Sequence, residues 1–430
     1  MEMVLEFLRD VLSQPALLIG IMSCIGLIAL KRPFHKIMTG TLKPILGYLM
    51  LAAGAGVIVS NLDPLGKMIE HGFHITGVVP NNEAIVAVAQ KVLGVETMSI
   101  LVVGLLMNLC IARFTKFKYV FLTGHHSLFM ACLMSAVLGT AGLSGMELIL
   151  VGGFLMGAWS AISPAIGQSY TSKVTDGDEI AIGHFGSLGY YLSAWVAKYV
   201  GKAEDSTEDI EIPEKWGFLR DSTLSTALTM IVFYLIAAFA AGSEFVATLS
   251  GDMSPYLYAV MSAMNFAVGV TIVYSGVRMI LGDLIPAFQG IATKIIPNAI
   301  PAVDCAVFFT YAPTAVVLGF LSSFIGGIIG MLILGAVGGV LIIPGLVPHF
   351  FCGATAGIYG NATGGRRGAA VGAFLNGLAI TFLPALALPV LGQLGFQNTT
   401  FGDADFAVMG LVLGNAYEWV GMAGIYCLVA

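Results

Sequence analysis

Long apolar stretches separated by short charged turns run along almost the whole chain. A helix needs about 20 apolar residues to cross the hydrocarbon core of a bilayer. The clear candidates lie near residues 16–30, 42–60, 98–111, 119–138, 148–166, 224–241, 257–280, 314–334, 373–391 and 406–429. Segments 301–312 and 350–372 are also apolar, but prolines, glycines or charges interrupt them. The pattern predicts an all-α polytopic membrane protein with about eleven transmembrane helices, some of them broken or re-entrant.

Two basic turns orient these predicted spans. The first, at residues 31–43, contains Lys31 and Arg32, and the second, at residues 113–118, contains Arg113 and Lys116. Short basic loops stay in the cytoplasm, so we predict that both turns are cytoplasmic and that the N-terminus lies outside. Residues 61–90 mix charged and apolar positions and include two prolines. This mixture favours an outer amphipathic helix and loop, and not another span.

The stretch Thr175–Trp195 departs most clearly from the pattern. Asp176, Asp178 and Glu179 lie near its start, and an apolar run with several glycines and His184 follows at once. Irregular backbone at membrane depth is tolerated only where it is buried in protein or lines a watery cavity. Transporters build substrate sites from such broken segments. Two interpretations stay open: a broken or re-entrant segment that places His184 in a site, or an ordinary helix start with His184 at the interface.

A hydrophilic loop near the middle of the sequence divides the chain into halves. We predict a first membrane repeat with binding-site helices at residues 1–201, a connecting loop at 202–221, and a second such repeat at 222–430. In each half an apolar span precedes an amphipathic, proline-bearing stretch, at 61–90 and at 282–300. The placement of charge suggests that the halves have opposite orientations. Inverted repeats of this kind hold the binding site at their interface.

The composition supports a membrane location and argues against several other classes. The chain is 57% hydrophobic and 10% charged, with a mean hydropathy of +0.91, whereas soluble domains carry about 25% charged residues. The net charge is −6 and no large basic cluster occurs, so no nucleic-acid partner is predicted. The six cysteines are isolated, and we predict neither a metal site nor a disulfide framework. The acidic first residues and the spans that follow argue against a cleaved signal peptide.

Polar residues at membrane depth are the candidates for chemistry. Phosphate-binding loops, dinucleotide fingerprints and nucleophile motifs do not occur in the sequence, so no cofactor and no catalytic nucleophile are predicted, and a membrane-embedded enzyme is the weakest hypothesis. Polar and ionisable groups inside a membrane usually face a cavity or a partner, and here they are His125, His126, His184, Asp304, Thr310, Asn361, Thr363 and Glu418. Asp304 is the strongest candidate because its flanks are wholly apolar. Two histidines and a carboxylate suit either a small polyhydroxylated solute or a proton relay.

Five segments of the sequence resemble one family of bacterial transport proteins. They are VFLTGH (Val120–His125), VTDGDEIAIGH (Val174–His184), GKAEDSTEDIEIP (201–213), AVDCAVFFTYAPTAVVLGF (Ala302–Phe320) and LIIPGLVPHFF (Leu341–Phe351). They are similar to the ascorbate-type phosphotransferase-system permeases, the membrane (IIC) subunits of the bacterial vitamin C uptake system. The resemblance implies a homodimer in the cytoplasmic (inner) membrane, in which a core domain moves by alternating access against a V-shaped dimerisation domain. It also implies that a cytoplasmic IIB subunit, working with IIA, phosphorylates the imported L-ascorbate.

The resemblance also assigns residues to the binding site. The family's histidine after Thr-Gly matches His125, its histidine after Ile-Gly matches His184, and its buried aspartate matches Asp304. Family members carry glutamine where this chain has Phe129 and Phe185. The predicted substrate-binding residues are His125, Phe129, His184, Phe185, Asp304, Ser60 and Thr314. The two phenylalanines leave open a related sugar acid or a polyol as substrate, and the histidines and carboxylate leave open a proton-coupled secondary transporter.

Overall fold

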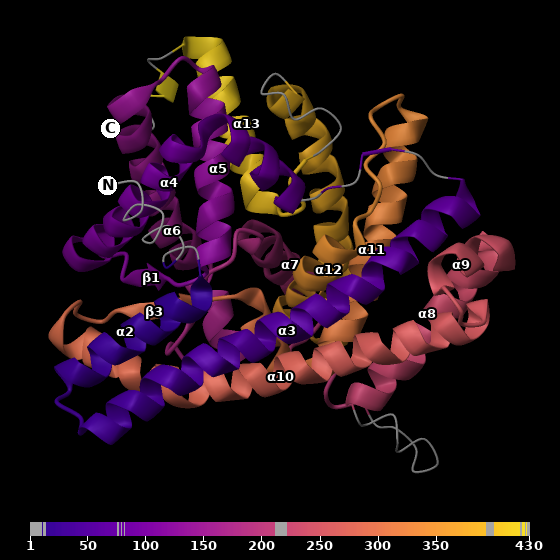
Figure 1. Ribbon diagram of the computed structural model, residues 1–430, viewed down its shortest axis with the longest axis horizontal. Coiled ribbons are helices and arrows are strands. Elements are labelled where there is room, and N and C mark those ends of the chain that lie inside the picture. The colour runs from indigo at the N-terminus through magenta and orange to yellow at the C-terminus, as the bar shows by residue number, and fades with distance from the viewer. Residues whose placement is uncertain are drawn as a thin grey trace.

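The computed structural model describes residue 11 and residues 14–74, 77–78, 80, 82–210, 222–392, 400–421, 424–425 and 427. Most of these residues are helical, and three very short strands lie among them (Figure 1). In chain order the elements are α2 (Pro15–Ala29), α3 (Phe34–Phe73), α4 (Asn82–Phe114), β1 (Tyr119–Phe121), α5 (Gly124–Thr140), α6 (Gly145–Thr175), β2 (Ala181–Ile182), α7 (Ser187–Val200), α8 (Ser222–Ala241), α9 (Ser243–Ser250), α10 (Pro255–Lys294), β3 (Ile300–Val303), the 3₁₀ helix η2 (Cys305–Thr310), α11 (Pro313–Ala336), α12 (Leu346–Gly392) and α13 (Ala404–Val420).

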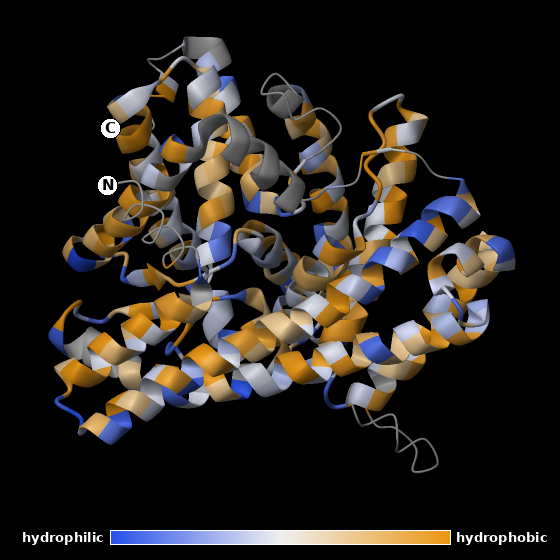
Figure 2. Cartoon of the chain, viewed as in Figure 1, coloured by the Kyte–Doolittle hydropathy of each residue, from blue (hydrophilic) through white to orange (hydrophobic). Residues whose placement is uncertain are grey.

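Two helices of 40 residues each, α3 and α10, lie side by side along one edge of the molecule (Figure 1). Apolar residues follow both helices for most of their length (Figure 2). Glycines form their contact: a Cβ on Gly47 would lie 2.9 Å from the Gly276 carbonyl oxygen, and a Cβ on Gly54 would lie 2.7 Å from that of Gly269. Small residues let membrane helices approach this closely. The order of the pairs shows that α3 and α10 are antiparallel.

Substituting Gly54 by alanine is expected to separate α3 from α10. The new methyl group would meet backbone atoms of α10, at 2.7 Å from the Gly269 oxygen and 2.8 Å from the Val273 nitrogen, and overpacking of this kind costs about 1–3 kcal/mol. Gly56→Ala is the matched control on the same helix, because nothing lies within 4 Å of its Cβ. Thermal unfolding in detergent should show a lower midpoint for Gly54→Ala alone. Equal midpoints for the two variants would contradict this account of the contact.

The three strands form one parallel sheet in the order β1–β3–β2. The central strand β3 pairs Ala302 with Phe121 of β1 on one side and with Ala181 of β2 on the other. Segments near residues 120, 182 and 302 are therefore neighbours in space although they are far apart in sequence. Because the strands are parallel, their carboxyl ends meet at the same edge of the sheet.

Side-chain amides bond backbone groups of β1 and of the residue just before β2. Asn108 of α4 donates to the Tyr119 carbonyl oxygen (3.1 Å) and accepts from the Phe121 amide (3.0 Å). On the opposite edge, Gln168 of α6 donates to the Ile180 carbonyl oxygen (3.1 Å). Unpaired backbone groups are costly at membrane depth, so these two amides make a strand edge tolerable there.

Six helices among the described residues are long and apolar enough to cross a membrane, and a seventh span results if the bent pair α8–α9 is counted as one. The break predicted between Asn361 and Arg367 lies at Gly364 and Gly365, whose backbone angles are not helical, so α12 consists of two helices joined at a kink. The finding supports a polytopic membrane protein. The predicted number of about eleven spans stays a prediction, as does the cytoplasmic location of the basic turns.

Three local predictions are corrected by the structure, which also favours one of the two interpretations left open for a fourth stretch. Helix α3 continues without a break to Phe73, so residues 61–73 extend a span and do not form a separate helix. Residues 119–121, predicted within the span 119–138, form strand β1, and residues 301–303, predicted within the apolar segment 301–312, belong to strand β3. The remainder of segment 301–312 includes the short η2. The stretch Thr175–Trp195 is not a simple helix start, because β2 intervenes between α6 and α7, which favours the broken-segment interpretation. Part of the predicted connecting loop, residues 211–221, lies outside the described residues.

Candidate functional site

The carboxyl edge of the sheet positions three of the residues predicted from the sequence. His125 lies at the start of α5, four residues after β1 ends, while His184 lies two residues after β2 and Asp304 follows β3 directly. The parallel order of the strands brings these three chain segments to one edge. Ligands of open parallel sheets bind at this edge for the same geometric reason.

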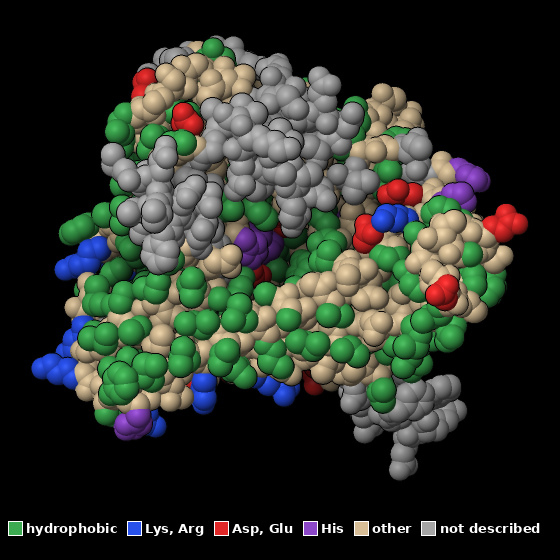
Figure 3. Space-filling view, viewed as in Figure 1, with side chains coloured by type: hydrophobic (Ala, Val, Ile, Leu, Met, Phe, Trp, Pro, Cys, Tyr) green, Lys and Arg blue, Asp and Glu red, His purple; other side chains and the backbone are tan. Residues whose placement is uncertain are grey.

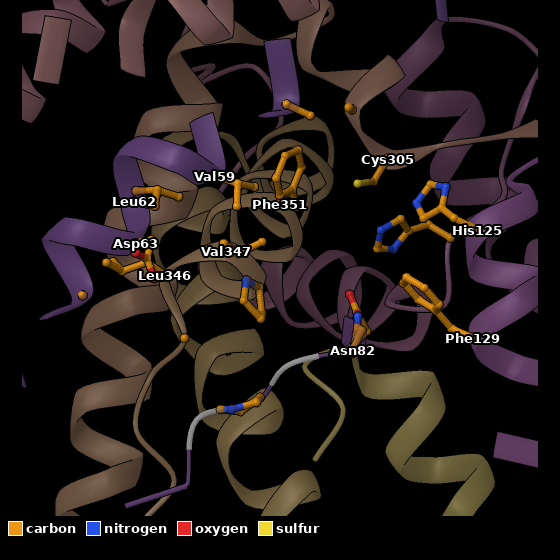
Figure 4. Close-up of a pocket in the computed structure, with 18 of the residues that line it drawn as sticks. Val59, Leu62, Asp63, Asn82, His125, Phe129, Cys305, Leu346, Val347 and Phe351 are labelled. Atoms are coloured by element: carbon orange, nitrogen blue, oxygen red, sulfur yellow. The ribbon is translucent and has the colours of Figure 1, made fainter. Parts of the chain in front are cut away.

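A cavity of about 690 Å³ opens at this edge. Figure 3 shows a hollow in the face of the molecule with a histidine side chain at its margin. In Figure 4, His125, Phe129, Cys305 and Asn82 lie on one side of the cavity, opposite an apolar wall from α3 and the start of α12 that includes Val59, Leu62, Leu346, Val347 and Phe351. The cavity therefore has a polar side, next to the sheet, and a mainly apolar side, to which α3 also contributes Asp63, Lys67 and Glu70.

Asp304 and His125 form a pair on the polar side. Asp304 Oδ2 lies 3.5 Å from His125 Nε2, and its Oδ1 accepts a hydrogen bond from the Ala306 amide at 3.2 Å, which caps η2. The hydroxyl of Tyr48, from α3, lies 3.4 Å from His125 Nδ1. Asp304 is buried, whereas the His125 side chain is 37% exposed. Oδ1 of Asp304 thus accepts from a backbone amide, and Oδ2 lies beside the His125 imidazole at the cavity.

His184 and His126 are each held in one tautomer by backbone amides. The Gly186 amide donates to His184 Nδ1 (3.2 Å), and the Phe185 amide donates to His126 Nδ1 (3.3 Å). A nitrogen that accepts carries no proton in the neutral ring, so we assign the proton of each ring to Nε2. The Tyr190 hydroxyl also donates to His184 Nδ1 (2.8 Å). Both rings line the cavity, their centroids 3.8 Å apart, and each offers Nε2–H as a donor.

Asp403 is a second buried carboxylate on the cavity wall, and the sequence analysis missed it. Its Oδ1 accepts from the Cys352 thiol (2.7 Å) and its Oδ2 accepts from the Asn82 amide (2.5 Å). Asp405, two residues further on, is also buried, but it caps α7 by accepting from the Ser187 hydroxyl (2.8 Å) and the Leu188 amide (2.9 Å). The sequence signal was the pair of acids in FGDADF at the start of an apolar span.

The other predicted substrate-binding residues are placed differently. Phe129 lines the cavity near His125 and His126. The ring of Phe185 is fully buried and stacks on Phe121, with centroids 4.6 Å apart, and Phe185 is not among the residues that line the cavity. The Ser60 hydroxyl donates a hydrogen bond to the Val57 carbonyl oxygen of its own helix. The amide and hydroxyl of Thr314 donate to the carboxylate of Glu208. Neither Ser60 nor Thr314 is among the residues that line the cavity.

Three further polar residues predicted at membrane depth contact the protein itself. The Asn361 oxygen accepts from the Thr207 amide (2.8 Å), which holds the connecting loop against α12. The Thr363 hydroxyl donates to the Ala194 carbonyl oxygen at 3.1 Å, and that of Thr310 to its own 3₁₀ helix. The side chain of Glu418 lies outside the described residues.

Among the described residues, two overlapping groups of side chains have donor atoms close enough to hold a cation. They share His184, and within each group the donor atoms lie within 4.8 Å of one another: His184, Asp304 and Cys305, and His184, Cys352 and Asp403. A metal takes cysteine as the thiolate, but the Cys352 thiol here donates its proton to Asp403. The second group therefore fits hydrogen bonding to a hydroxylated solute better than metal ligation. The prediction of no metal stays a prediction.

Long apolar helices around a cavity with one polar side define a multi-pass membrane protein. Residues 10–405 match the family described as EIIC-GAT, PTS system sugar-specific permease component, and the chain belongs to this family. One curated relative, the ascorbate-specific PTS system EIIC component of Mycoplasma pneumoniae (strain ATCC 29342 / M129 / Subtype 1), is 28% identical over 417 residues. These residues cover 83% of this chain and 62% of the relative, so the chain spans less than two thirds of the relative's length. Both findings confirm the resemblance seen in the sequence.

Proposed function

We propose that this protein imports L-ascorbate across the bacterial cytoplasmic membrane as a IIC component, and that a cytoplasmic IIB subunit, working with IIA, phosphorylates the imported solute. The observation that carries the proposal is the meeting of His125, His184 and Asp304 at one sheet edge, on a buried cavity. Membership of a sugar-specific permease family supports solute transport. The name of the Mycoplasma relative supports ascorbate.

The chemistry of the polar side fits a monoanionic, hydroxylated ring. Ascorbate carries an enolate oxygen near neutral pH, and the Nε2–H groups of His126 and His184 are neutral donors that can bind it. The Asp304 oxygen that faces the cavity accepts from a ring hydroxyl. Phe129 and the apolar wall supply contact for the faces of the ring. A related sugar acid or a polyol could also donate its hydroxyls to Asp304. Because Phe129 lines the cavity, its ring contributes to the selection among these solutes.

The assembly belongs to the same proposal. We place the two long helices α3 and α10 in the dimerisation domain of a homodimer, and the sheet with its surrounding helices in the moving core. The repeats at residues 1–201 and 222–430 then contribute one long helix each, α3 and α10, which have equal length and meet antiparallel through reciprocal glycine contacts. Alternating access would expose the cavity in turn to the two sides of the membrane.

A proton-coupled secondary transporter is the second candidate. The observation in its favour is the 3.5 Å distance between His125 Nε2 and Asp304 Oδ2, because an imidazole beside a carboxylate is a proton relay in many pumps. The two candidates differ in the product that they release. A IIC component delivers phosphorylated solute, and a proton-coupled carrier accumulates free solute.

Ligand-induced stabilisation of the purified protein tests the substrate. At a concentration of 100 times the dissociation constant, a ligand that binds only the folded protein adds about 2.7 kcal/mol of stability. We expect L-ascorbate to raise the unfolding midpoint in detergent, and D-mannitol to raise it less because it lacks the enolate. A rise with mannitol alone would reassign the site to a polyol, and no rise with ascorbate at any concentration would contradict the proposed substrate.

A further inference from the structure

Asp403 differs from Asp304 in the partners that hold it. Asp304 lies beside the His125 imidazole, whereas the partners of Asp403 are the neutral donors Cys352 and Asn82. Its backbone also joins the network, since the neighbouring Gly402 amide donates to the Asn82 oxygen at 2.8 Å. The Asp403 carboxylate is therefore fixed in place from α4 and α12.

The position of Asp403 puts it within reach of a bound solute. It lines the same cavity as Asp304 and His184, and it is 5% exposed. Donor atoms of His184 lie within 4.8 Å of carboxylate oxygens of Asp304 in one group and of Asp403 in the other. A solute bound beside His184 in this cavity thus lies near two carboxylates, Asp304 and Asp403.

A carboxylate has about four lone-pair positions, and the described partners of Asp403 occupy two of them. The remaining positions can accept from hydroxyl groups. An enolate oxygen is repelled there, because no cationic side chain is among the described partners of Asp403. A neutral hydroxyl pair is attracted, since a hydrogen bond to a charged acceptor is worth about 1.5–3 kcal/mol.

We propose that Asp403 binds the neutral side-chain hydroxyls of the solute, and that it thereby orients the anionic ring toward the histidines and Asp304. This inference rests on the proposed function and adds a specificity-determining residue to its site. It commits the solute to one orientation in the cavity, with the uncharged diol end at Asp403. A solute lacking that diol loses the contact and keeps the contacts of its ring.

The test compares L-ascorbate with 6-deoxy-L-ascorbate, which lacks one side-chain hydroxyl and has an unchanged ring. Dissociation constants are measured on the purified full chain. The unmodified protein should prefer ascorbate by about tenfold or more, which corresponds to one hydrogen bond to a charged group. In Asp403→Asn the acceptor is neutral, and this preference should fall by about fivefold to tenfold. The affinity for the deoxy compound should change much less.

Asp405→Asn is the matched control, because Asp405 is a buried aspartate two residues away whose carboxylate accepts from the Ser187 hydroxyl and the Leu188 amide at the start of α7. It should change the unfolding midpoint and leave the preference between the two compounds intact. If Asp403→Asn does not give monodisperse protein, Asp403→Ser, which keeps a small polar group beside Asn82 and Cys352, replaces it with the same expected results.

The outcomes separate the two proposals. If Asp403→Asn keeps the full preference for L-ascorbate over 6-deoxy-L-ascorbate, the proposed role of Asp403 is overturned and the proposed function stands. The same holds if Asp405→Asn loses as much of that preference as Asp403→Asn does. Failure of the unmodified protein to bind ascorbate overturns the proposed function and the role of Asp403 together. A selective loss of preference in Asp403→Asn supports both.

Discussion

Replacing Asp304 by asparagine is expected to abolish ascorbate uptake without unfolding the protein. Asparagine caps helices as well as aspartate does, so the hydrogen bond from the Ala306 amide that begins η2 can be kept. The negative charge that faces the cavity beside His125 is lost. A hydrogen bond to a charged partner contributes about 1.5–3 kcal/mol, so ligand affinity should fall by about 10-fold to 150-fold.

Uptake of labelled ascorbate and the unfolding midpoint should be measured on the same preparations. Asp252→Asn, at an exposed turn after α9, is the matched control for loss of one negative charge and should transport normally. Asp304→Ala removes the cap as well, and we expect it to lower both uptake and the midpoint. Normal uptake by Asp304→Asn would remove this carboxylate from the site.

The His184 substitutions separate the two nitrogens of the ring. In His184→Asn the short amide can still accept from the Gly186 amide near the position of Nδ1, but it cannot replace the Nε2–H donor. In His184→Gln the longer amide can place an N–H near the position of Nε2. We expect His184→Asn to lose at least about tenfold in ascorbate affinity, and His184→Gln to recover part of that loss.

His349 provides a control for the loss of a buried histidine. It is 2% exposed, its Nδ1 lies 2.9 Å from the Ser323 hydroxyl and so links α12 to α11, and it is not among the residues that line the cavity. His349→Ala should lower the unfolding midpoint while the folded fraction binds ascorbate normally. If His184→Asn and His184→Ala bind ascorbate as the unmodified protein does, then His184 serves the fold and not the solute.

The sequence predicts the membrane class and three site residues because their signals are strong locally. An aspartate inside a wholly apolar run, such as Asp304, has few explanations apart from a cavity. The strands escape prediction because β1, β2 and β3 contain three, two and four residues, too few for a periodic pattern to separate them from helix. Their pairing is a long-range property that joins residues 121, 181 and 302.

Two acids near the end of the chain show a different limit. Asp403 and Asp405 have the same residue type and similar burial, yet one lines the cavity and the other caps a helix. Only the partners from α4, α12 and α7 distinguish them. Such partners come from tertiary structure, which a local sequence pattern cannot supply.

The two phenylalanines that replace glutamines in the family pattern also separate in the structure. Phe129 lines the cavity, so its exchange for glutamine would place an amide within reach of a solute. Phe185 is packed among Phe121 and Phe406, where a buried amide without partners costs stability. Of the two phenylalanines, Phe129 is therefore the one expected to affect substrate selectivity.

Transport into sealed vesicles tests the central claim most directly. Vesicles containing the protein are loaded with phosphorylated IIB and IIA, and labelled L-ascorbate is added outside. We expect label to accumulate inside as phosphorylated ascorbate when phosphorylated IIB is present, and not when IIB is omitted or unphosphorylated. Accumulation of free ascorbate without IIB, driven by a pH gradient alone, would contradict the account and establish a proton-coupled transporter.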